Sequence, residues 1–184
     1  MKLTKKLEAQ ILKDYHALWE ANLRGDINTF ASFLDNNVTV YGTAAGEIFK
    51  TKKEAVKFYK ATADQMTGKA DFRKRKIGIK AIGDTIVINE QCDLYVFAEA
   101  AWVFYGHARV TAIFEQKGNS WKVVHMHGSF PDSRTGEGEQ LNTDKIKEEN
   151  IQLRDAVRRR TEELENKNRE LEIETALEKV RTVA

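Results

Sequence analysis

The sequence predicts an α+β domain, in which three N-terminal helices pack on a sheet that curls over them, followed by a C-terminal coiled-coil helix. Apolar residues recur at helical spacing over residues 3–66, whereas the period changes to two over residues 72–130. Residues 142–184 contain no glycine, proline or aromatic residue and are rich in Glu, Lys, Arg and Leu. These patterns place the helices first, an antiparallel sheet second and a long helix last.

The first two helices are predicted from their apolar spacing and from residues that end or begin a helix. Apolar positions follow a helical period from residue 3 to residue 23, and Gly25 comes next as a left-handed cap. Asp26 can accept a backbone amide hydrogen bond at the start of a short second helix. Residues 38–41 then alternate as a strand.

The third helix is expected to begin with a capping box. Thr51 and Glu54 have the spacing at which a hydroxyl and a carboxylate satisfy free amides of the first turn. The helix is predicted to run to about Met66, and Gly68 ends it.

Four β-rich stretches follow at about 71–82, 85–98, 101–115 and 120–130. Side chains alternate between the two faces of a strand, so parity groups the residues of each stretch. On the third stretch, one face is predicted to carry Tyr105, His107, Arg109 and Thr111, and the other Trp102, Phe104, Ala108, Val110, Ala112 and Phe114. On the fourth stretch, one face is predicted to carry Trp121, Val123, His125, His127 and Ser129.

The folded domain is expected to end at the only proline of the chain, Pro131. The residues after it are polar, contain two glycines and have no periodicity. We therefore predict a domain over residues 1–130, a linker over 131–141 and a signalling helix over 142–184.

The C-terminal helix carries the seam of a left-handed coiled coil, because its members alternate in steps of four and three. The predicted seam consists of Ile146, Asn150, Leu153, Val157, Arg160, Leu164, Lys167 and Leu171, and after a one-residue slip Leu177, Val180 and Ala184. Polar seam residues weaken a coil but define its register. The alternative is a solvated single helix; the sustained spacing favours association as a homodimer.

Composition excludes several classes of function. Thirty basic and 28 acidic residues leave a formal charge of +2, too little to direct the molecule to nucleic acid or an anionic membrane. The basic run at residues 73–76 enters a strand without interleaved aromatic residues, which favours a solvated edge over nucleic-acid binding. The single cysteine, Cys92, lies in an apolar run and is interpreted as a buried small hydrophobe. Without a signal peptide or membrane span, a cytoplasmic location is expected.

Short motifs in the sheet region resemble a known superfamily. The stretch from Trp121 to Pro131, with its His-Met-His-Gly-Ser run, follows Arg109-Val-Thr111 and resembles the last strands of the SnoaL-like branch of the nuclear transport factor 2-like superfamily. It is also similar to the end of the association domain of calcium/calmodulin-dependent protein kinase II. Gly25-Asp26 and the segment from Gly42 to Glu47 match the same branch in order and spacing.

The resemblance covers about residues 5–131 and implies a cone, in which helices pack on a strongly curved sheet around a pocket. It also implies dimerisation through the sheet. Members of the superfamily include isomerases, cyclases, dehydratases and binding modules, so the fold does not give the function. The segment from Arg160 to Arg181 is similar to linkers of bacterial sensor proteins, which carry a signal to a histidine kinase, a cyclase or a similar output module.

Several residues are candidates for a ligand pocket. Arg109 could bind a carboxylate, or it could form an internal salt bridge to an acidic residue of the sheet, such as Glu90, Asp93 or Glu99. Aromatic side chains could form the pocket wall or simply be core. The aromatic set is Trp19, Phe49, Phe58, Tyr59, Tyr95 and Trp102. The predicted ligand-binding residues are Tyr15, Trp19, Phe49, Phe58, Tyr95, Tyr105, His107, Arg109, His125 and His127.

Neither a metal nor a cofactor is expected. His107, His125 and His127 could in principle hold zinc, but no Asp, Glu or Cys accompanies them at ligand spacing, so structural hydrogen bonds are favoured. The favoured function is a non-catalytic module that binds an unidentified small molecule and passes its state through the coiled coil. The alternatives are a pure assembly module, and an isomerase or cyclase acting on a small carbonyl compound through Asp93, Tyr15 and His127, with Asp14 as a further candidate.

Overall fold

The computed structural model describes residues 2–132, 135, 138 and 143–183, and the side chains up to residue 173. The chain divides into two units, Met1–Pro131 and Asp132–Ala184. Most of the predicted linker lies outside the described residues.

The first two helices end and begin where their capping residues predict. Helix α1 spans Lys5–Leu23, and Gly25 follows with a φ of 72°, in the left-handed region that favours glycine. Helix α2 spans Ile27–Ser32, and the Asp26 carboxylate accepts a hydrogen bond of 3.0 Å from the amide of Thr29. Both helices are therefore confirmed.

The predicted third helix is interrupted. Helix α3 spans Lys52–Ala61 and the short helix α4 spans Ala63–Met66. The hydroxyl of Thr62 donates to the carbonyl of Phe58 at 3.0 Å and leaves Thr62 outside helical geometry. A continuous helix to Met66 was therefore the wrong prediction.

The capping box of α3 is only half formed. The amide of Glu54 donates to the Thr51 hydroxyl at 3.3 Å. The Glu54 carboxylate accepts from the amide of Lys50 at 2.9 Å, one residue before the expected partner. The helix start is still satisfied by both side chains.

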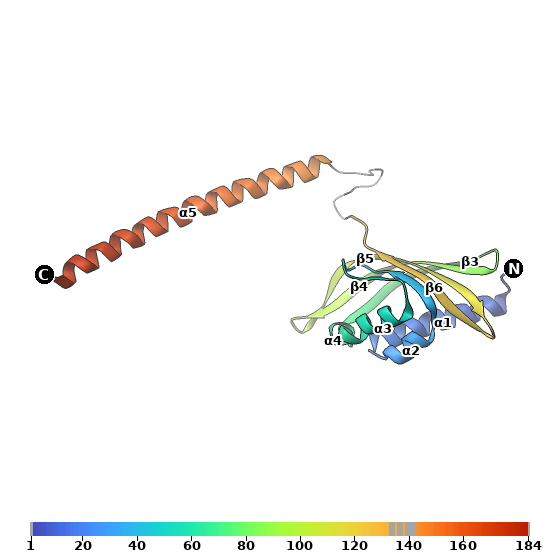
Figure 1. The fold of residues 1–184 in the computed structure, drawn as a ribbon. Helices are drawn as coiled ribbons and strands as arrows, with labels where there is room; N and C mark the ends of the chain where they lie inside the picture. The colour runs from blue at the N-terminus through green and yellow to red at the C-terminus, as the bar shows by residue number, and fades with distance from the viewer. Residues whose placement is uncertain (1, 133–134, 136–137, 139–142, 184) are drawn as a thin grey trace. The chain divides into compact units, whose positions relative to one another are not determined.

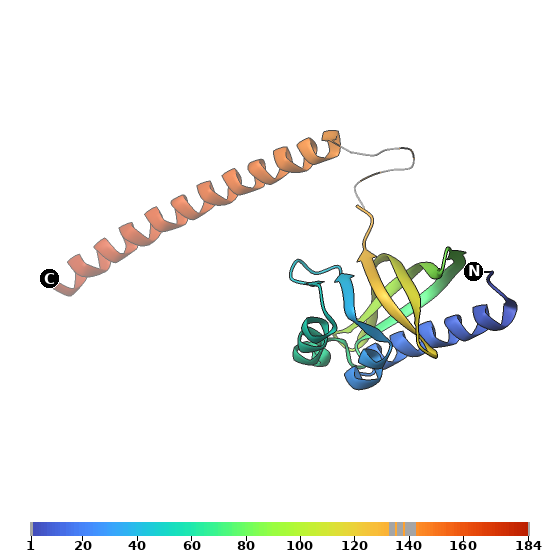
Figure 2. The ribbon, with the colours of Figure 1, turned by 45° about the vertical axis from the view of Figure 1, so that its right-hand side comes forward.

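Six strands form one mixed sheet in the order β2-β1-β6-β5-β4-β3. Their bounds are β1 Leu34–Tyr41, β2 Ile48–Phe49, β3 Ala70–Ile82, β4 Thr85–Ala98, β5 Ala101–Lys117 and β6 Ser120–Ser129. Strands β3 to β6 form the predicted antiparallel meander, but β1 pairs with β6 in parallel. The sheet is strongly curved, and α1 to α4 lie on one side of it (Figure 1, Figure 2).

The core lies between these helices and the sheet face that they cover, called here the helix-facing face. Ile11, Leu18 and Phe30 from the helices meet Ile88 and Phe114 from the sheet, and all five are fully buried. The opposite face is called the outer face. Its residues include Gln91, Asp93, Tyr95, His107, Arg109, His125 and His127.

Two β-bulges overturn the predicted grouping of side chains by parity. Gly106 pairs with Leu94 and Phe104 with Tyr95, so Tyr105 is an extra residue in β5. Trp102 and Phe104 therefore share the outer face with His107, instead of lying with Ala108 as predicted.

The second bulge lies in β6. Val123 pairs with Phe114 and His125 with Ile113, so Val124 is the extra residue. Val123 is fully buried on the helix-facing face, whereas His125 and His127 lie on the outer face. The predicted common face for Trp121, Val123 and the two histidines is therefore wrong, because a one-residue insertion reverses the alternation.

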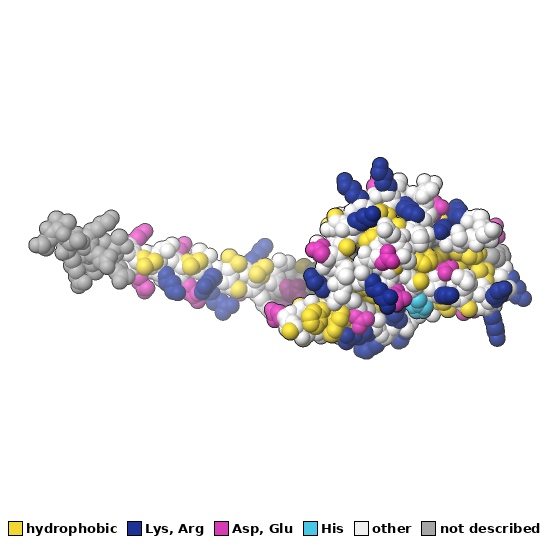
Figure 3. Space-filling model, turned by 90° about the horizontal axis from the view of Figure 1, so that it is seen from below, with side chains coloured by type: hydrophobic (Ala, Val, Ile, Leu, Met, Phe, Trp, Pro, Cys, Tyr) yellow, Lys and Arg dark blue, Asp and Glu magenta, His cyan; other side chains and the backbone are white. Residues whose placement is uncertain are grey.

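The second unit contains helix α5, which spans Thr143–Val183 and is about 62 Å long at ~1.5 Å per residue. Hydrophobic side chains recur along its surface (Figure 3). Seam residues Leu153, Val157, Leu164 and Leu171 are each at least 50% exposed. Leu177, Val180 and Ala184 lie outside the described side chains. None of the described helices is long and apolar enough to cross a bilayer.

Candidate functional site

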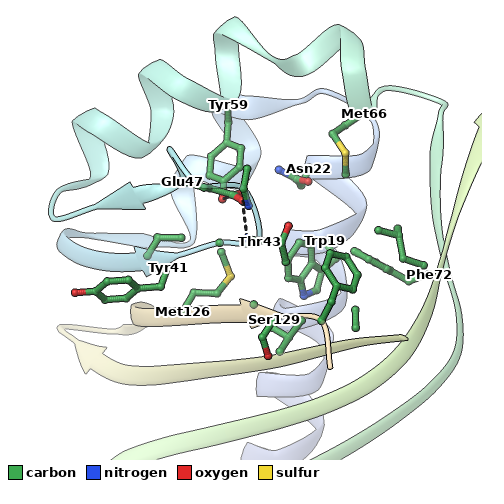
Figure 4. Close-up of a pocket in the computed structure, with 18 of the residues that line it drawn as sticks. Trp19, Asn22, Tyr41, Thr43, Glu47, Tyr59, Met66, Phe72, Met126 and Ser129 are labelled. Atoms are coloured by element: carbon green, nitrogen blue, oxygen red, sulfur yellow. Dashed lines mark hydrogen bonds between the residues drawn. The ribbon is translucent and has the colours of Figure 1, made fainter. Parts of the chain in front are cut away.

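A cavity of about 350 Å³ opens between the helices and one end of the curved sheet. Helices α1, α3 and α4 contribute one wall, the loop of residues 42–47 a second, and strands β4 to β6 the floor (Figure 4). The lining is mostly apolar. Its larger apolar side chains are Trp19, Phe58, Tyr59, Met66, Phe72, Leu94, Val96, Val110, Met126 and Phe130.

Aromatic rings fix the shape of the cavity wall. Trp19 from α1 and Phe72 from β3 meet edge to face, with ring centroids 5.1 Å apart and planes at 82°. Phe58 and Tyr59 pack in the same manner at 5.5 Å. Each ring holds its neighbour in place, so the wall is built before any ligand arrives.

Glu47 fastens the loop of residues 42–47 to α3. Its Oε1 accepts a hydrogen bond of 2.7 Å from the Tyr59 hydroxyl, and its Oε2 accepts from the amides of Thr43 and Ala44 at 2.9 and 3.3 Å. Burial, reinforced by the charge and hydrogen bond of Glu47, raises the pKa of Tyr59 well above its usual value. Tyr59 therefore stays protonated and continues to donate to Glu47.

Asn22 is the most deeply buried polar side chain in the lining. The residue is 6% exposed, and it lies in the last turn of α1 with its amide directed into the cavity (Figure 4). Its side chain makes no hydrogen bond with any residue that the structure describes.

Arg109 and Tyr105 form part of the rim. The Tyr105 ring lies 5.5 Å from that of Phe130, because the bulge turns Tyr105 toward the cavity. Arg109 is exposed, and its guanidinium forms no ion pair with the described residues. The alternative salt bridges of Arg109 to Glu90, Asp93 or Glu99 do not form; Glu90 pairs with Arg75, and Asp93 pairs with Lys74.

The structure separates the predicted pocket residues into three groups. Trp19, Phe58, Tyr105 and Arg109 line the cavity. Tyr15 and Phe49 belong to the buried core beneath it. Tyr95, His107, His125 and His127 lie on the outer face and do not line the cavity. Arg109 lies on the same face, but it pairs with Ser129 at the end of β6, where both residues border the cavity.

Tyr15 does not line the cavity; it belongs to a buried hydrogen-bonded cluster in the core. Its hydroxyl donates to Glu90 Oε2 at 2.6 Å, and Arg75 pairs with both oxygens of the same carboxylate. Burial and the negative charge of Glu90 raise the pKa of Tyr15. These contacts give Tyr15 and Glu90 a structural role.

Asp93, a candidate catalytic residue of the enzyme alternative, is paired on the outer face. It accepts hydrogen bonds from Lys74 at 3.0 Å and from His107 at 2.8 Å. The hydrogen bond from Lys74, followed by that from His107, lowers the pKa of Asp93. A base that removes a proton near neutral pH needs the opposite shift, so the geometry does not support this role.

Two of the three histidines considered as zinc ligands, His107 and His125, make hydrogen bonds with side chains of neighbouring strands. His125 Nδ1 lies 2.7 Å from the Thr39 hydroxyl. Within the described residues, no three or more His, Cys, Asp or Glu side chains gather as metal ligands would. His107 Nδ1 lies 2.8 Å from Asp93 Oδ1.

Aromatic residues expected in the pocket wall form a separate cluster on the outer face. The Arg73 guanidinium lies 4.2 Å from the ring centre of Tyr95 and 5.4 Å from that of Trp102. Trp102 also packs against Phe97, with ring centroids 5.5 Å apart. Tyr95 and Trp102 therefore do not line the cavity, and this cluster leaves aromatic surface exposed.

Sequence reasoning did not place several of the lining residues. One feature of the sequence could have pointed to Glu47: Gly42 and Gly46 bracket the loop that Glu47 anchors. No sequence feature identifies Asn22 or Phe72 as lining residues, since neither lies in a motif or at a position with distinctive spacing.

The SnoaL-like domain family matches residues 10–133. The chain belongs to this family. No significant match is found among curated proteins. Solved structures with the nuclear transport factor 2-like fold resemble it, including a protein of unknown function from Pseudomonas putida KT2440. That likeness has a TM-score of 0.62 and 19% identity, and covers 77% of this chain and 99% of the other.

Two further structures carry provisional enzyme names. A protein from Streptomyces avermitilis, provisionally named a dehydratase, has 18% identity and a TM-score of 0.59, over 68% of this chain and 96% of its own. A protein from Shewanella frigidimarina NCIMB 400, provisionally named a ketosteroid isomerase, has 15% identity and a TM-score of 0.53, over 64% and 92%. At these identities the likeness establishes the fold alone.

Proposed function

We propose that this SnoaL-like domain is a non-catalytic module that binds a small, largely apolar molecule in its cavity. The main support for this function is the cavity, whose volume of about 350 Å³ falls within the roughly 300–1,000 Å³ of small-molecule sites. Its aromatic walls and few polar groups have the composition typical of such sites.

The chemistry of the lining favours binding over catalysis. Glu47 is the one carboxylate among the lining residues, and its two oxygens already accept three hydrogen bonds. A carboxylate engaged in this way is poorly placed to take a proton from a substrate. Asp93 and His127, the other residues considered for catalysis, lie on the outer face.

We further propose that α5 passes the state of the cavity to an output module, in the manner of the bacterial sensor linkers that its sequence resembles. The exposed seam from Leu153 to Leu171 needs a partner helix, which a second copy of the chain supplies as a coiled coil. The exposed aromatic cluster around Trp102 supports a second contact between copies through the sheet. We expect such a module to act in the cytoplasm, upstream of a kinase or cyclase.

A second candidate function is an isomerase, cyclase or dehydratase acting on a small carbonyl compound. The provisional names of two fold neighbours favour it. Turnover of such a compound that is lost in Glu47→Gln and kept in Asp93→Asn would support this alternative over the binding module.

The test of the binding function is a thermal-shift screen with small ketones, carboxylates and aromatic metabolites. A ligand at 100 times its Kd adds about 2.7 kcal/mol to the free energy of unfolding. The hit should disappear in Leu94→Trp, which fills the cavity, and persist in Val87→Trp, which adds the same bulk on the outer face of the same strand. A hit that survives Leu94→Trp in a folded protein would place binding elsewhere, and no hit at all would favour a pure assembly module.

A further inference from the structure

We infer that Asn22 recognises the ligand, and that the ligand is a flat, uncharged ring compound with an amide-like edge, such as a lactam. In such an edge an N–H donor stands next to a carbonyl acceptor. This inference rests on the proposed binding function and names the chemistry of its ligand.

The side-chain amide of Asn22 has a free hydrogen-bond donor and acceptor in the cavity. The residue is 6% exposed and lines the cavity, yet its side-chain oxygen and nitrogen make no hydrogen bond with the described residues. The fully buried side-chain atom without a partner among the described residues is Trp19 Nε1, whereas the Asn22 amide is accessible from the cavity and is available to a group that enters it. In Figure 4 the amide projects from α1 into the space near Tyr59 and Met66.

Local helix chemistry does not account for this residue. An asparagine within a helix can donate to the carbonyl four residues earlier, as Asn150 does to Ile146 at 2.9 Å. Asn22 makes no such bond. It is also not needed to end α1, because its backbone carbonyl, not its side chain, accepts from the amide of Gly25 at 3.0 Å.

The chemistry of the amide selects the kind of group that fits. A side-chain amide offers one acceptor and one donor side by side, so a ligand that satisfies both must present a donor next to an acceptor. Asparagine pairs with the edge of adenine in this way. A lone ketone would leave the Asn22 carbonyl unpaired, whereas a lactam satisfies both atoms.

The charges around the cavity select a neutral ligand. Arg109 is the one basic side chain in the lining, and it lies at the exposed rim. A carboxylate placed at Asn22 would therefore be buried without a cation, in a lining that already contains the Glu47 carboxylate. An anion at this position is disfavoured.

The shape of the walls selects a flat and small ligand. The perpendicular rings of Trp19 and Phe72, and those of Phe58 and Tyr59, present faces and edges against which a planar ring packs well. The volume of about 350 Å³ is near the lower end for ligand sites, which suits one ring or two fused rings.

The experiment compares three probes of nearly equal size by titration calorimetry. The probe 2-quinolinone has the complete lactam edge, 1-methyl-2-quinolinone lacks the donor, and quinoline offers a single acceptor. We expect 2-quinolinone to bind the wild-type chain about ten-fold more tightly than the other two. Asn22→Leu, which keeps the number and branching of the side-chain heavy atoms, should abolish this preference, while Asn28→Leu on the exposed side of α2 should preserve it.

A second readout concerns stability without ligand. Asn22→Leu should keep or raise the thermal midpoint, because the side-chain amide makes no hydrogen bond with the described residues that the substitution could remove. A marked fall would mean that the protein itself satisfies Asn22, which overturns the inference.

The outcomes separate the inference from the proposed function. Binding of all three probes with equal affinity, or a lactam preference that survives Asn22→Leu, overturns the inference and leaves the binding function in place. Absence of binding by every probe to the wild-type chain counts against both. A lactam preference lost in Asn22→Leu alone supports both.

Discussion

The Tyr15 hydroxyl on α1 donates a hydrogen bond of 2.6 Å to Oε2 of Glu90 on β4, in a part of the core where both residues are almost fully buried. The Glu90 carboxylate also pairs with Arg75 through two guanidinium nitrogens. This contact joins the first helix to the middle of the sheet. It explains how a charged residue is tolerated in the core, since both oxygens have partners.

The Arg75–Glu90 pair should dominate the stability of this region. Arg75→Met leaves a buried carboxylate with Tyr15 as its remaining partner, so we expect the free energy of unfolding to fall by about 3–5 kcal/mol. Tyr15→Phe removes one hydrogen bond and should cost about 1 kcal/mol. Both values can be measured by urea unfolding.

The matched control is Arg73→Met, two residues away on β3. Arg73 pairs with Asp71, and both side chains are about two-fifths exposed, at 40% and 43%. Exposed ion pairs contribute little, and the exposed contact of Arg73 with the rings of Tyr95 and Trp102 adds about 0.5–1 kcal/mol, so the loss should stay below about 2 kcal/mol. Equal effects of Arg75→Met and Arg73→Met would contradict the structural role assigned to Glu90.

The loop of residues 42–47 should depend on the absence of a side chain at Gly42. A Cβ atom there would lie 1.9 Å from the Glu47 carboxylate, so Gly42→Ala must displace Glu47 from its hydrogen bonds with Tyr59 and Thr43. We expect a loss of about 1–3 kcal/mol and weaker binding of any cavity ligand.

Gly46→Ala is the control for this prediction, because a Cβ atom at Gly46 meets nothing within 4 Å. It should change stability by no more than about 0.5 kcal/mol. If the two alanine variants melt at the same temperature, the packing of Glu47 against Gly42 does not contribute to the free energy of unfolding.

Acid should destabilise the sheet through His125. Burial, followed by the charge of His127, lowers the pKa of His125, so the unfolded chain binds a proton more readily than the folded one. Stability is therefore complete above the unfolded pKa of about 6.5 and is lost as the pH falls through that value toward the folded pKa.

Unfolding curves between pH 8 and pH 5 measure this effect. The loss of stability should be smaller in His125→Gln than in the wild type. His127→Gln removes the charge of His127 but not the burial of His125, so its loss of stability at low pH should lie between those of the wild type and His125→Gln. A pH dependence that is identical in the wild type and in His125→Gln would show that other groups are responsible.

The sequence predicted where helices and strands occur but not which way several side chains point. Capping residues such as Asp26 and Thr51 act locally, through amides within three residues, so their signals are readable. The bulges at Tyr105 and Val124 depend instead on pairing with neighbouring strands. Parity then fails, and it fails for the very residues proposed as the pocket.

The cavity residues were predicted in part for a similar reason. Trp19 and Phe58 could be found because large aromatic residues on the inner faces of helices border whatever space lies beneath them. The roles of Asn22 and Glu47 depend on residues distant in the sequence. Asn22 has no hydrogen-bond partner among the described residues, and Glu47 accepts a hydrogen bond from Tyr59. Neither property can be read from neighbouring residues in the chain.

The seam of α5 can be tested with two substitutions of similar chemistry. Leu164 lies in the seam and is 50% exposed, whereas Ile151 lies beside the seam and is 61% exposed. In a dimer, Leu164→Ser removes two leucines from the interface, each contributing about 1.5–3 kcal/mol when buried. We expect the dimer dissociation constant to rise by about a hundred-fold or more, and Ile151→Ser to leave it unchanged. Sedimentation equilibrium over a range of concentrations measures both, and equal effects of the two would show that α5 does not associate through this seam.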